Sequence, residues 1–204
     1  MIHIEKFVVG FLDTNCYVVY SDENDKAIII DAGGGYAAVS RFLEEKNKKP
    51  IAVLCTHGHF DHIKHAKRWQ DKGIPVYAHA MDKELLNGNK AKIEGHKFPI
   101  DYITADYFVQ DGEKLVFADK VFEVIHTPGH TKGGVCYLLN DRYLFSGDTI
   151  FYHSYGRTDF YSGDYEEMKT SVKKILSSEG DLLIYPGHGE STTLKEERLF
   201  NPLA

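Results

Sequence analysis

The stretch that decides the fold is residues 51–62, which read IAVLCTHGHFDH. The apolar residues 51–55 predict a buried strand, and the strand ends abruptly in a turn that holds three histidines and one aspartate. From composition alone, a His-x-His-x-Asp-His match is expected in roughly one such chain in 400. Gly58 permits a tight turn, so the side chains around it can converge. The stretch therefore predicts a metal-binding turn at the end of a strand.

Three further apolar segments end in the same way. They are residues 124–130 (VIHTPGH), 143–148 (YLFSGD) and 182–189 (LLIYPGHG). Each runs into a turn that contains a glycine and a metal-competent side chain, so we expect the four turns to lie at one edge of the strands. A shared edge would bring their imidazoles and carboxylates to one point, as a metal site requires.

Seven side chains from these turns are candidate metal ligands, which is too many for one tetrahedral zinc ion. Alternate residues of an extended turn point the same way, whereas the last two residues of the first motif begin the next helix. We therefore expect two divalent metal ions: one held by His57, His59 and His130, the other by Asp61, His62 and His188, with Asp148 bridging them.

Composition excludes several classes of protein. The chain has 204 residues, 43% of them hydrophobic, and no linker divides it, which predicts a single domain over 1–204. Its 24 Lys and Arg against 30 Asp and Glu give a net charge of −6 without a basic run, which disfavours a nucleic-acid binder. Neither a signal peptide nor a membrane span is visible, so we expect a cytoplasmic protein without a membrane partner. Cys16, Cys55 and Cys136 form no Cys-x-x-Cys unit, which argues against a disulfide framework or a thiolate zinc finger.

Periodicity and breakers predict the order of the elements. Strands are expected over residues 2–9, 15–20, 27–31, 51–55, 76–77, 114–118, 121–125, 135–139, 143–145 and 182–185. Helices are expected over 36–47, 62–72, 79–87, 164–177 and 193–199, and the irregular stretch 88–108 is a candidate lid. Strands in two groups, each followed by helices, indicate two sheets stacked face to face with helices outside. The expected fold is thus an α/β protein, a four-layer α/β/β/α sandwich.

The four turns resemble the successive metal motifs of the metallo-β-lactamase fold superfamily. Within that superfamily the chain is most similar to the short, single-domain hydroxyacylglutathione hydrolase (glyoxalase II) branch. The subgroup is indicated by residues 155–160 (YGRTDF), 162–165 (SGDY) and the ending Glu197-x-x-x-Asn201-Pro202. The resemblance implies the same four-layer sandwich and the same two metal positions.

The resemblance also implies an activity, metal-dependent hydrolysis of a small thioester such as S-lactoylglutathione by a metal-bridging hydroxide. Zinc is the expected metal, with iron or manganese as alternatives, and Asp61 is the candidate proton acceptor. Lys132, Tyr155 and Arg157 are candidate substrate contacts, although an ion pair with Asp159 is the plainer role for Arg157. Asp31 is a candidate hydrogen-bond partner of a ligand histidine. The sequence leaves the oligomeric state open.

Two other activities are weighed against the thioesterase. A mononuclear iron persulfide dioxygenase of the same superfamily would use His57, His130 and Asp148 as its iron ligands. A nucleic-acid-processing nuclease of the same fold is disfavoured by the acidic charge and by the lack of a basic arm.

Overall fold

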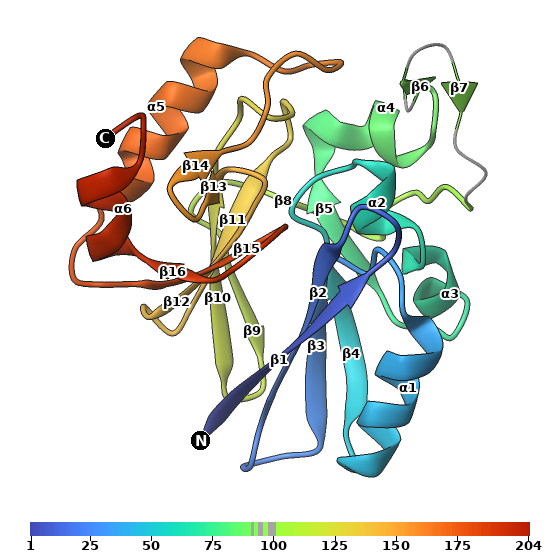
Figure 1. The fold of residues 1–204 in the computed structure, drawn as a ribbon. Coiled ribbons are helices and arrows are strands. Elements are labelled where there is room, and N and C mark those ends of the chain that lie inside the picture. The colour runs from blue at the N-terminus through green and yellow to red at the C-terminus, as the bar shows by residue number, and fades with distance from the viewer. Residues whose placement is uncertain (91, 94–95, 98–100) are drawn as a thin grey trace.

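Two six-stranded sheets form the centre of the molecule (Figure 1). The structure is a computed structural model, and it describes residues 1–90, 92–93, 96–97 and 101–204. The strand order is β1-β2-β3-β4-β5-β8 in the first sheet and β16-β15-β12-β11-β10-β9 in the second. Helices lie outside both sheets, so the predicted four-layer α/β/β/α sandwich is confirmed.

The first sheet opens with the expected antiparallel meander. It contains β1 (Ile2–Val9), β2 (Thr14–Ser21) and β3 (Lys26–Ile30). Three parallel pairings then add β4 (Lys49–Leu54), β5 (Val76–His79) and β8 (Tyr107–Val109). A parallel neighbour needs a crossover, which α1 (Tyr36–Glu45) supplies between β3 and β4.

The second sheet is antiparallel through its first four strands. These are β9 (Lys114–Phe117), β10 (Lys120–His126), β11 (Val135–Leu139) and β12 (Tyr143–Gly147). Helix α5 (Tyr165–Leu176) then returns the chain to β15 (Leu183–Pro186), which pairs with β12 in parallel, and β16 (Thr192–Thr193) forms the edge. Asp164 caps α5, because its side chain accepts a hydrogen bond from the backbone N–H of Glu167.

Alternate residues of the central strands pack into different hydrophobic cores. In β3, Ile28 and Ile30 enter the core between the sheets, whereas Ala27 and Ile29 face the helices of the first sheet. Both faces of the strand are therefore buried from Ala27 onward, which explains why residues 27–30 are all apolar rather than alternating. The outer core of the second sheet forms in the same way against α5 and α6 (Leu194–Phe200).

The helices differ from the sequence prediction at two places. The helix expected over 62–72 is split into α2 (Phe60–Ile63) and α3 (Ala66–Gln70). It breaks at His65, whose backbone N–H donates to the carbonyl of Ala32 and whose Nδ1 accepts from the N–H of Tyr36. The helix expected over 79–87 is a 3₁₀ turn, η1 (Ala80–Asp82), followed by the short α4 (Lys83–Leu86).

Short strands account for the other differences. The stretch 88–108, expected to be irregular, contains β6 (Lys92–Ile93), β7 (His96–Lys97) and the start of β8. The lid interpretation of this stretch rests in part on residues 91, 94–95 and 98–100, which lie outside the described residues. A small hairpin of β13 (Ile150–Phe151) and β14 (Ser154–Tyr155) was not expected, because two-residue strands leave no periodic signal.

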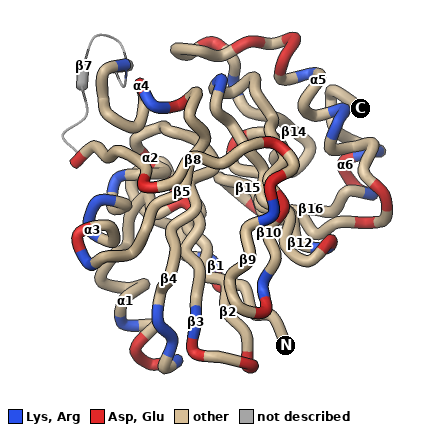
Figure 2. The backbone as a smooth tube through the Cα atoms, turned by 180° about the vertical axis from the view of Figure 1, so that it is seen from behind, with Lys and Arg blue, Asp and Glu red and all other residues tan. Residues whose placement is uncertain are grey.

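Charged side chains are mixed over the surface. Figure 2 shows Lys and Arg interspersed with Asp and Glu along the helices and loops, rather than a face of one sign. Among the described residues, no helix is both long and apolar enough to cross a bilayer. The mixed charge agrees with the absence of a basic run in the sequence.

We predict that the core between the sheets carries a large share of the stability. Phe145 is fully buried there, and its ring lies 5.4 Å from that of Tyr17 and 5.3 Å from that of Tyr185. Phe145→Ala should lower the free energy of unfolding by about 3–5 kcal/mol, measured by urea denaturation. The matched control is Phe200→Ala, at a side chain 55% exposed, which should cost less than about 1 kcal/mol. Equal losses in the two variants would contradict this assignment of the core.

Candidate metal centre

The structure brings all seven candidate ligands together at one edge of the sandwich. The residues follow the ends of β4, β10, β12 and β15, as the four strand-end motifs predict. Three overlapping groups of side chains have ligand atoms within 4.8 Å of one another: His57, His59 and His130; His57, His62 and Asp148; and Asp61, His62 and His188.

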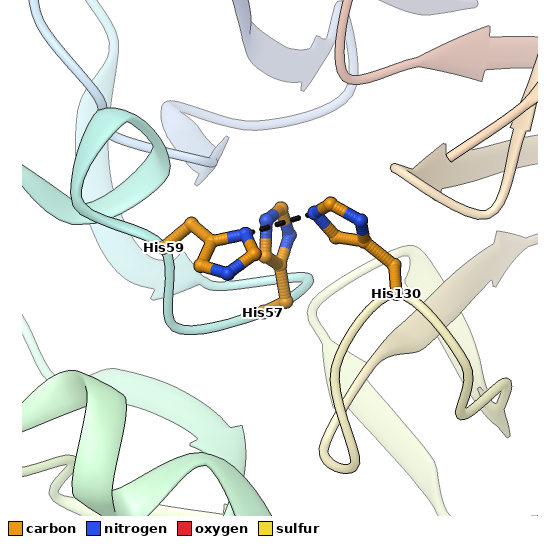
Figure 3. Close-up of side chains that lie close together, drawn as sticks. All are labelled: His57, His59 and His130. Carbon is orange, nitrogen blue, oxygen red and sulfur yellow. Dashed lines mark hydrogen bonds between the residues drawn. The ribbon is translucent and has the colours of Figure 1, made fainter. Parts of the chain in front are cut away.

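The first group consists of three imidazoles from two loops. His57 and His59 come from the loop after β4, and His130 comes from the loop after β10 (Figure 3). Nδ1 of His59 lies 2.8 Å from Nε2 of His130, and the centroids of the three rings in Figure 3 lie 4.6 to 4.8 Å from one another. His57 and His130 are buried, while His59 is half-buried. His59 is therefore the most accessible of the three imidazoles.

The second group lies directly beside the first. Nε2 of His188 is 3.3 Å from Nε2 of His62 and 3.3 Å from Oδ2 of Asp61. Asp148 lies between the groups: its Oδ1 is 3.4 Å from Nε2 of His62, and its Oδ2 is 3.3 Å from Nε2 of His130. One carboxylate can thus reach both positions.

Two buried polar atoms in the cluster lack a hydrogen-bond partner. They are Nε2 of His57 and Oδ1 of Asp148. A buried polar atom without a partner is costly, and native proteins rarely keep one without a reason. A cation would satisfy both atoms, and imidazole with carboxylate is a donor set that divalent transition metals accept. The cluster is therefore suited to a centre of two metal ions.

Hydrogen bonds fix which nitrogen of each ring faces the centre. The hydroxyl of Thr56 donates its only proton to Asp31, so it accepts from Nδ1 of His57 at 3.1 Å. The carbonyls of Arg157 and Leu12 accept from Nδ1 of His130 and His188 at 2.7 and 3.0 Å. With Nδ1 bound to an oxygen in this way, each of these three rings turns Nε2 toward the cluster.

Asp31 fulfils the role that the sequence predicted for it. Its Oδ2 accepts from Nδ1 of His62 at 2.8 Å, and its Oδ1 accepts from the backbone N–H of Thr56 at 2.7 Å. The residue is 2% exposed and has a φ of 52°, a left-handed conformation that aspartate adopts more readily than most residues. The end of β3 therefore supports both the turn and one of its histidines.

The ionisation of the cluster follows from burial and from its neighbours. Burial lowers the pKa of His57 and His59 well below the usual value, and neighbouring imidazoles lower it further. Burial alone would also lower the pKa of His62, but the carboxylates of Asp61, Asp148 and Asp31 raise it to about 10. Neutral His57 and His59 keep their lone pairs for a metal, whereas a metal ion must displace a proton from His62.

Asp82 is a structural part of the centre that the sequence analysis did not identify. It is buried at the end of η1, and its carboxylate accepts from the N–H groups of Gly58 and Gly133, both at 2.7 Å, and from the hydroxyl of Thr131 at 2.8 Å. It therefore ties the loop after β4 to the loop after β10. No local pattern marks this role, because its partners are distant in the sequence.

A close approach explains one glycine of the motifs. A Cβ atom on Gly187 would collide with Oδ1 of Asp148 and with Cε1 of His62. Only glycine lets this backbone lie against the candidate ligands. The Pro-Gly-His-Gly sequence thus brings His188 to the centre and leaves space for the carboxylate that lies between the two groups.

A cavity of about 570 Å³ lies over the cluster. It is lined by five candidate ligands and by side chains from the β1–β2 turn, helix α2, the β13–β14 hairpin and the segment before α5: His59, Asp61, His130, Asp148 and His188, with Phe11, Leu12, Phe60, Phe151, Ser154, Tyr155, Arg157 and Phe160. Tyr155 and Arg157 were predicted as substrate contacts, and both line the cavity. Lys132 is not among the described lining residues; it is exposed, and its backbone N–H donates to Oγ of Ser162. The sequence analysis missed Phe11 and Leu12, because the turn that carries them lies far from every motif.

Comparison with known proteins identifies the family. Residues 9–188 match the family model of the metallo-beta-lactamase superfamily. Hydroxyacylglutathione hydrolase GloC of Haemophilus influenzae is 34% identical, with 98% of this chain and 97% of GloC aligned. The crystal structure of the BLEG-1 B3 metallo-beta-lactamase superimposes with a TM-score of 0.89 at 35% identity, over 98% of both chains. The crystal structure of TTHA1623 in a di-iron-bound form superimposes with a TM-score of 0.85 at 31% sequence identity, over 98% of this chain and 100% of that chain. The chain therefore belongs to the metallo-beta-lactamase superfamily.

Proposed function

We propose that the chain is a metal-dependent hydrolase of small thioesters, with S-2-hydroxyacylglutathiones such as S-lactoylglutathione as substrates. The observation that carries the proposal is the position of Asp148, whose Oδ2 lies 3.3 Å from Nε2 of His130 and 3.7 Å from Nε2 of His188. A carboxylate placed between two groups of imidazoles is what a two-metal hydrolytic centre requires. The likeness to GloC supports the choice of thioester.

The proposed centre holds two metal ions. The ligands of one would be His57, His59 and His130, those of the other Asp61, His62 and His188, and Asp148 would serve both. We propose zinc, while iron and manganese accept the same donors and TTHA1623 is a di-iron form. When bound, such ions lower the pKa of water and polarise a carbonyl group, which is the chemistry that thioester hydrolysis needs.

Asp61 is the residue proposed to accept a proton during turnover. It lines the cavity, and its Oδ2 accepts a hydrogen bond from the Thr14 hydroxyl at 2.8 Å. Burial alone would raise the pKa of Asp61, but His62, His188 and the Thr14 hydroxyl lower it below the usual value. The carboxylate is therefore ionised at neutral pH, although the lowered pKa makes it a weaker base than an ordinary aspartate, so the proposed role rests on its position in the cavity.

Three buried thiols support a cytoplasmic location as part of the proposal. Cys16, Cys55 and Cys136 are all buried and unpaired. Burial raises the pKa of each thiol, which keeps them unreactive. Free thiols without a disulfide fit a reducing compartment.

The first prediction concerns the reaction itself. The metal-loaded protein should cleave S-lactoylglutathione and release free thiol at the same rate with and without oxygen, because hydrolysis needs no oxidant. The measurement is thiol release in aerobic and anaerobic buffer, with glutathione persulfide and a β-lactam as comparison substrates. Oxygen uptake and sulfite formation from the persulfide, or β-lactam opening, without thioester cleavage would contradict the proposal.

A second prediction tests the shared carboxylate. Asp148→Ala should abolish hydrolysis and reduce metal content from about two equivalents to well below one, since both positions lose a ligand. Metal per chain is measured by elemental analysis after dialysis. Asp71→Ala, at a 60% exposed side chain paired with Lys67, is the matched control and should keep both ions. If Asp148→Ala lost one equivalent only, Asp148 would not serve both positions.

A third prediction concerns the partner of His62. Asp31→Asn should weaken zinc binding by about 10–100-fold, because the amide cannot hold the imidazole as a carboxylate does. Competition with a chromogenic chelator measures the affinity. Asp25→Asn, at a residue whose carboxylate pairs with Lys49 at the surface, should leave the affinity unchanged. An unchanged affinity in Asp31→Asn would show that His62 is positioned without this bond.

A further inference from the structure

The walls of the cavity over the centre are apolar. Phe11 and Leu12 project from the turn between β1 and β2, Phe60 begins α2, Phe151 belongs to β13, and Phe160 precedes α5. The rings of Phe11 and Phe60 stack with centroids 5.8 Å apart. Apolar side chains from separate elements thus line the same cavity.

The aromatic rings stand beside the candidate ligands on two sides. The ring centroid of Phe160 is 6.0 Å from that of His59, and the ring centroid of Phe151 is 6.1 Å from that of His188. A carbonyl group held over the cluster would therefore have apolar surface around it. The cavity of about 570 Å³ is also much larger than a lactoyl group and falls in the range of pockets that enclose drug-sized ligands.

Away from the proposed metal positions, the walls of the cavity offer little to an anion. Among the described lining residues, Arg157 is the only one with a permanent positive charge, and its Nε and Nη2 donate to the two carboxylate oxygens of Asp159, at 2.6 and 2.7 Å. The same guanidinium lies 3.8 Å from the ring centroid of Phe160. A carboxylate held against the aromatic rings, out of reach of the proposed metal ions, would lose its hydration without gaining a positively charged partner, which is costly.

We infer that the cavity selects thioesters whose acyl group carries a large, uncharged, apolar substituent. The inference rests on the proposed function. Glutathione carries two carboxylates and an ammonium group, so it suits the solvent side of the cavity better than the apolar wall. The acyl group is then the part that the aromatic residues enclose, and an aromatic 2-hydroxyacyl group fills the space better than lactoyl.

The test varies one substituent at a time. Three glutathione thioesters share a 2-hydroxyacyl core and differ only in what is attached to the lactoyl methyl carbon: hydrogen (lactoyl), phenyl (3-phenyllactoyl) or carboxylate (malyl). We expect kcat/KM for phenyllactoyl to exceed that for lactoyl by about tenfold or more, and malyl to be the slowest. The inference would be overturned if kcat/KM for the lactoyl thioester equalled or exceeded that for the phenyllactoyl thioester, or if kcat/KM for the malyl thioester exceeded that for the lactoyl thioester.

Binding of the free acids separates this inference from the proposed function. Calorimetry with the metal-loaded protein should show 3-phenyllactate binding about tenfold more tightly than lactate, whether or not any thioester is cleaved. Tighter phenyllactate binding without thioester cleavage would uphold the apolar pocket and refute the thioesterase. Equal or weaker phenyllactate binding would overturn the apolar pocket, whatever the turnover.

Two variants assign the effect to the wall. Phe151→Ala should reduce the preference for phenyllactoyl over lactoyl by about tenfold, whereas Phe108→Ala, at a partly exposed ring on β8 outside the cavity lining, should leave it unchanged. Phe11→Lys, at a side chain 68% exposed, places a cation at the rim of the cavity. This variant should raise kcat/KM for the malyl thioester relative to that for the phenyllactoyl thioester. Unaltered ratios in both wall variants would overturn the inference.

Discussion

The centre depends on hydrogen bonds that fix the protons of its imidazoles. Four of the five candidate histidines bind through Nδ1 to an oxygen outside the cluster: Thr56 Oγ1, Asp31 Oδ2, Arg157 O and Leu12 O serve His57, His62, His130 and His188. Because Nδ1 is occupied, Nε2 is the nitrogen that faces the cluster. His59 is the exception, since its Nδ1 faces Nε2 of His130. In these four rings, Nδ1, which binds the acceptor, is thus as important to the centre as Nε2, which faces the cluster.

These acceptors come from loops of both halves of the chain, which explains why the centre needs the whole sandwich. Asp31 follows β3 and Leu12 belongs to the turn after β1, whereas Arg157 follows the β13–β14 hairpin of the other half. Asn15 and Tyr17 of β2 both donate to the carbonyl of Pro186, at the end of β15. The core between the sheets fixes the distance between the two edges, so the packing of apolar residues determines whether the ligands meet.

The sequence predicted the layers and the four strand-end turns because both leave local signals. Buried strands leave short apolar runs, and a turn that must hold a metal leaves glycines beside histidine and aspartate. The break at His65 was missed, because its cause is a hydrogen bond to Ala32 that helical periodicity cannot report. Asp82 was missed because its three partners lie at residues 58, 131 and 133. Lys132 was proposed as a substrate contact from its closeness to His130 in sequence, but a tight turn points neighbouring side chains in different directions.

Polar and apolar residues divide the site between two tasks. The base of the cavity holds the carboxylates and imidazole lone pairs, and the hydrogen bonds behind it fix their positions. The walls, formed by rings such as Phe151 and Phe160, exclude solvent from the same space. A lower effective dielectric strengthens the interaction of a substrate carbonyl with a charged base. The same walls penalise any charged group that must enter beside that carbonyl, because its lost hydration is not replaced. Reactivity toward the carbonyl and selection against charged acyl groups therefore have one physical origin.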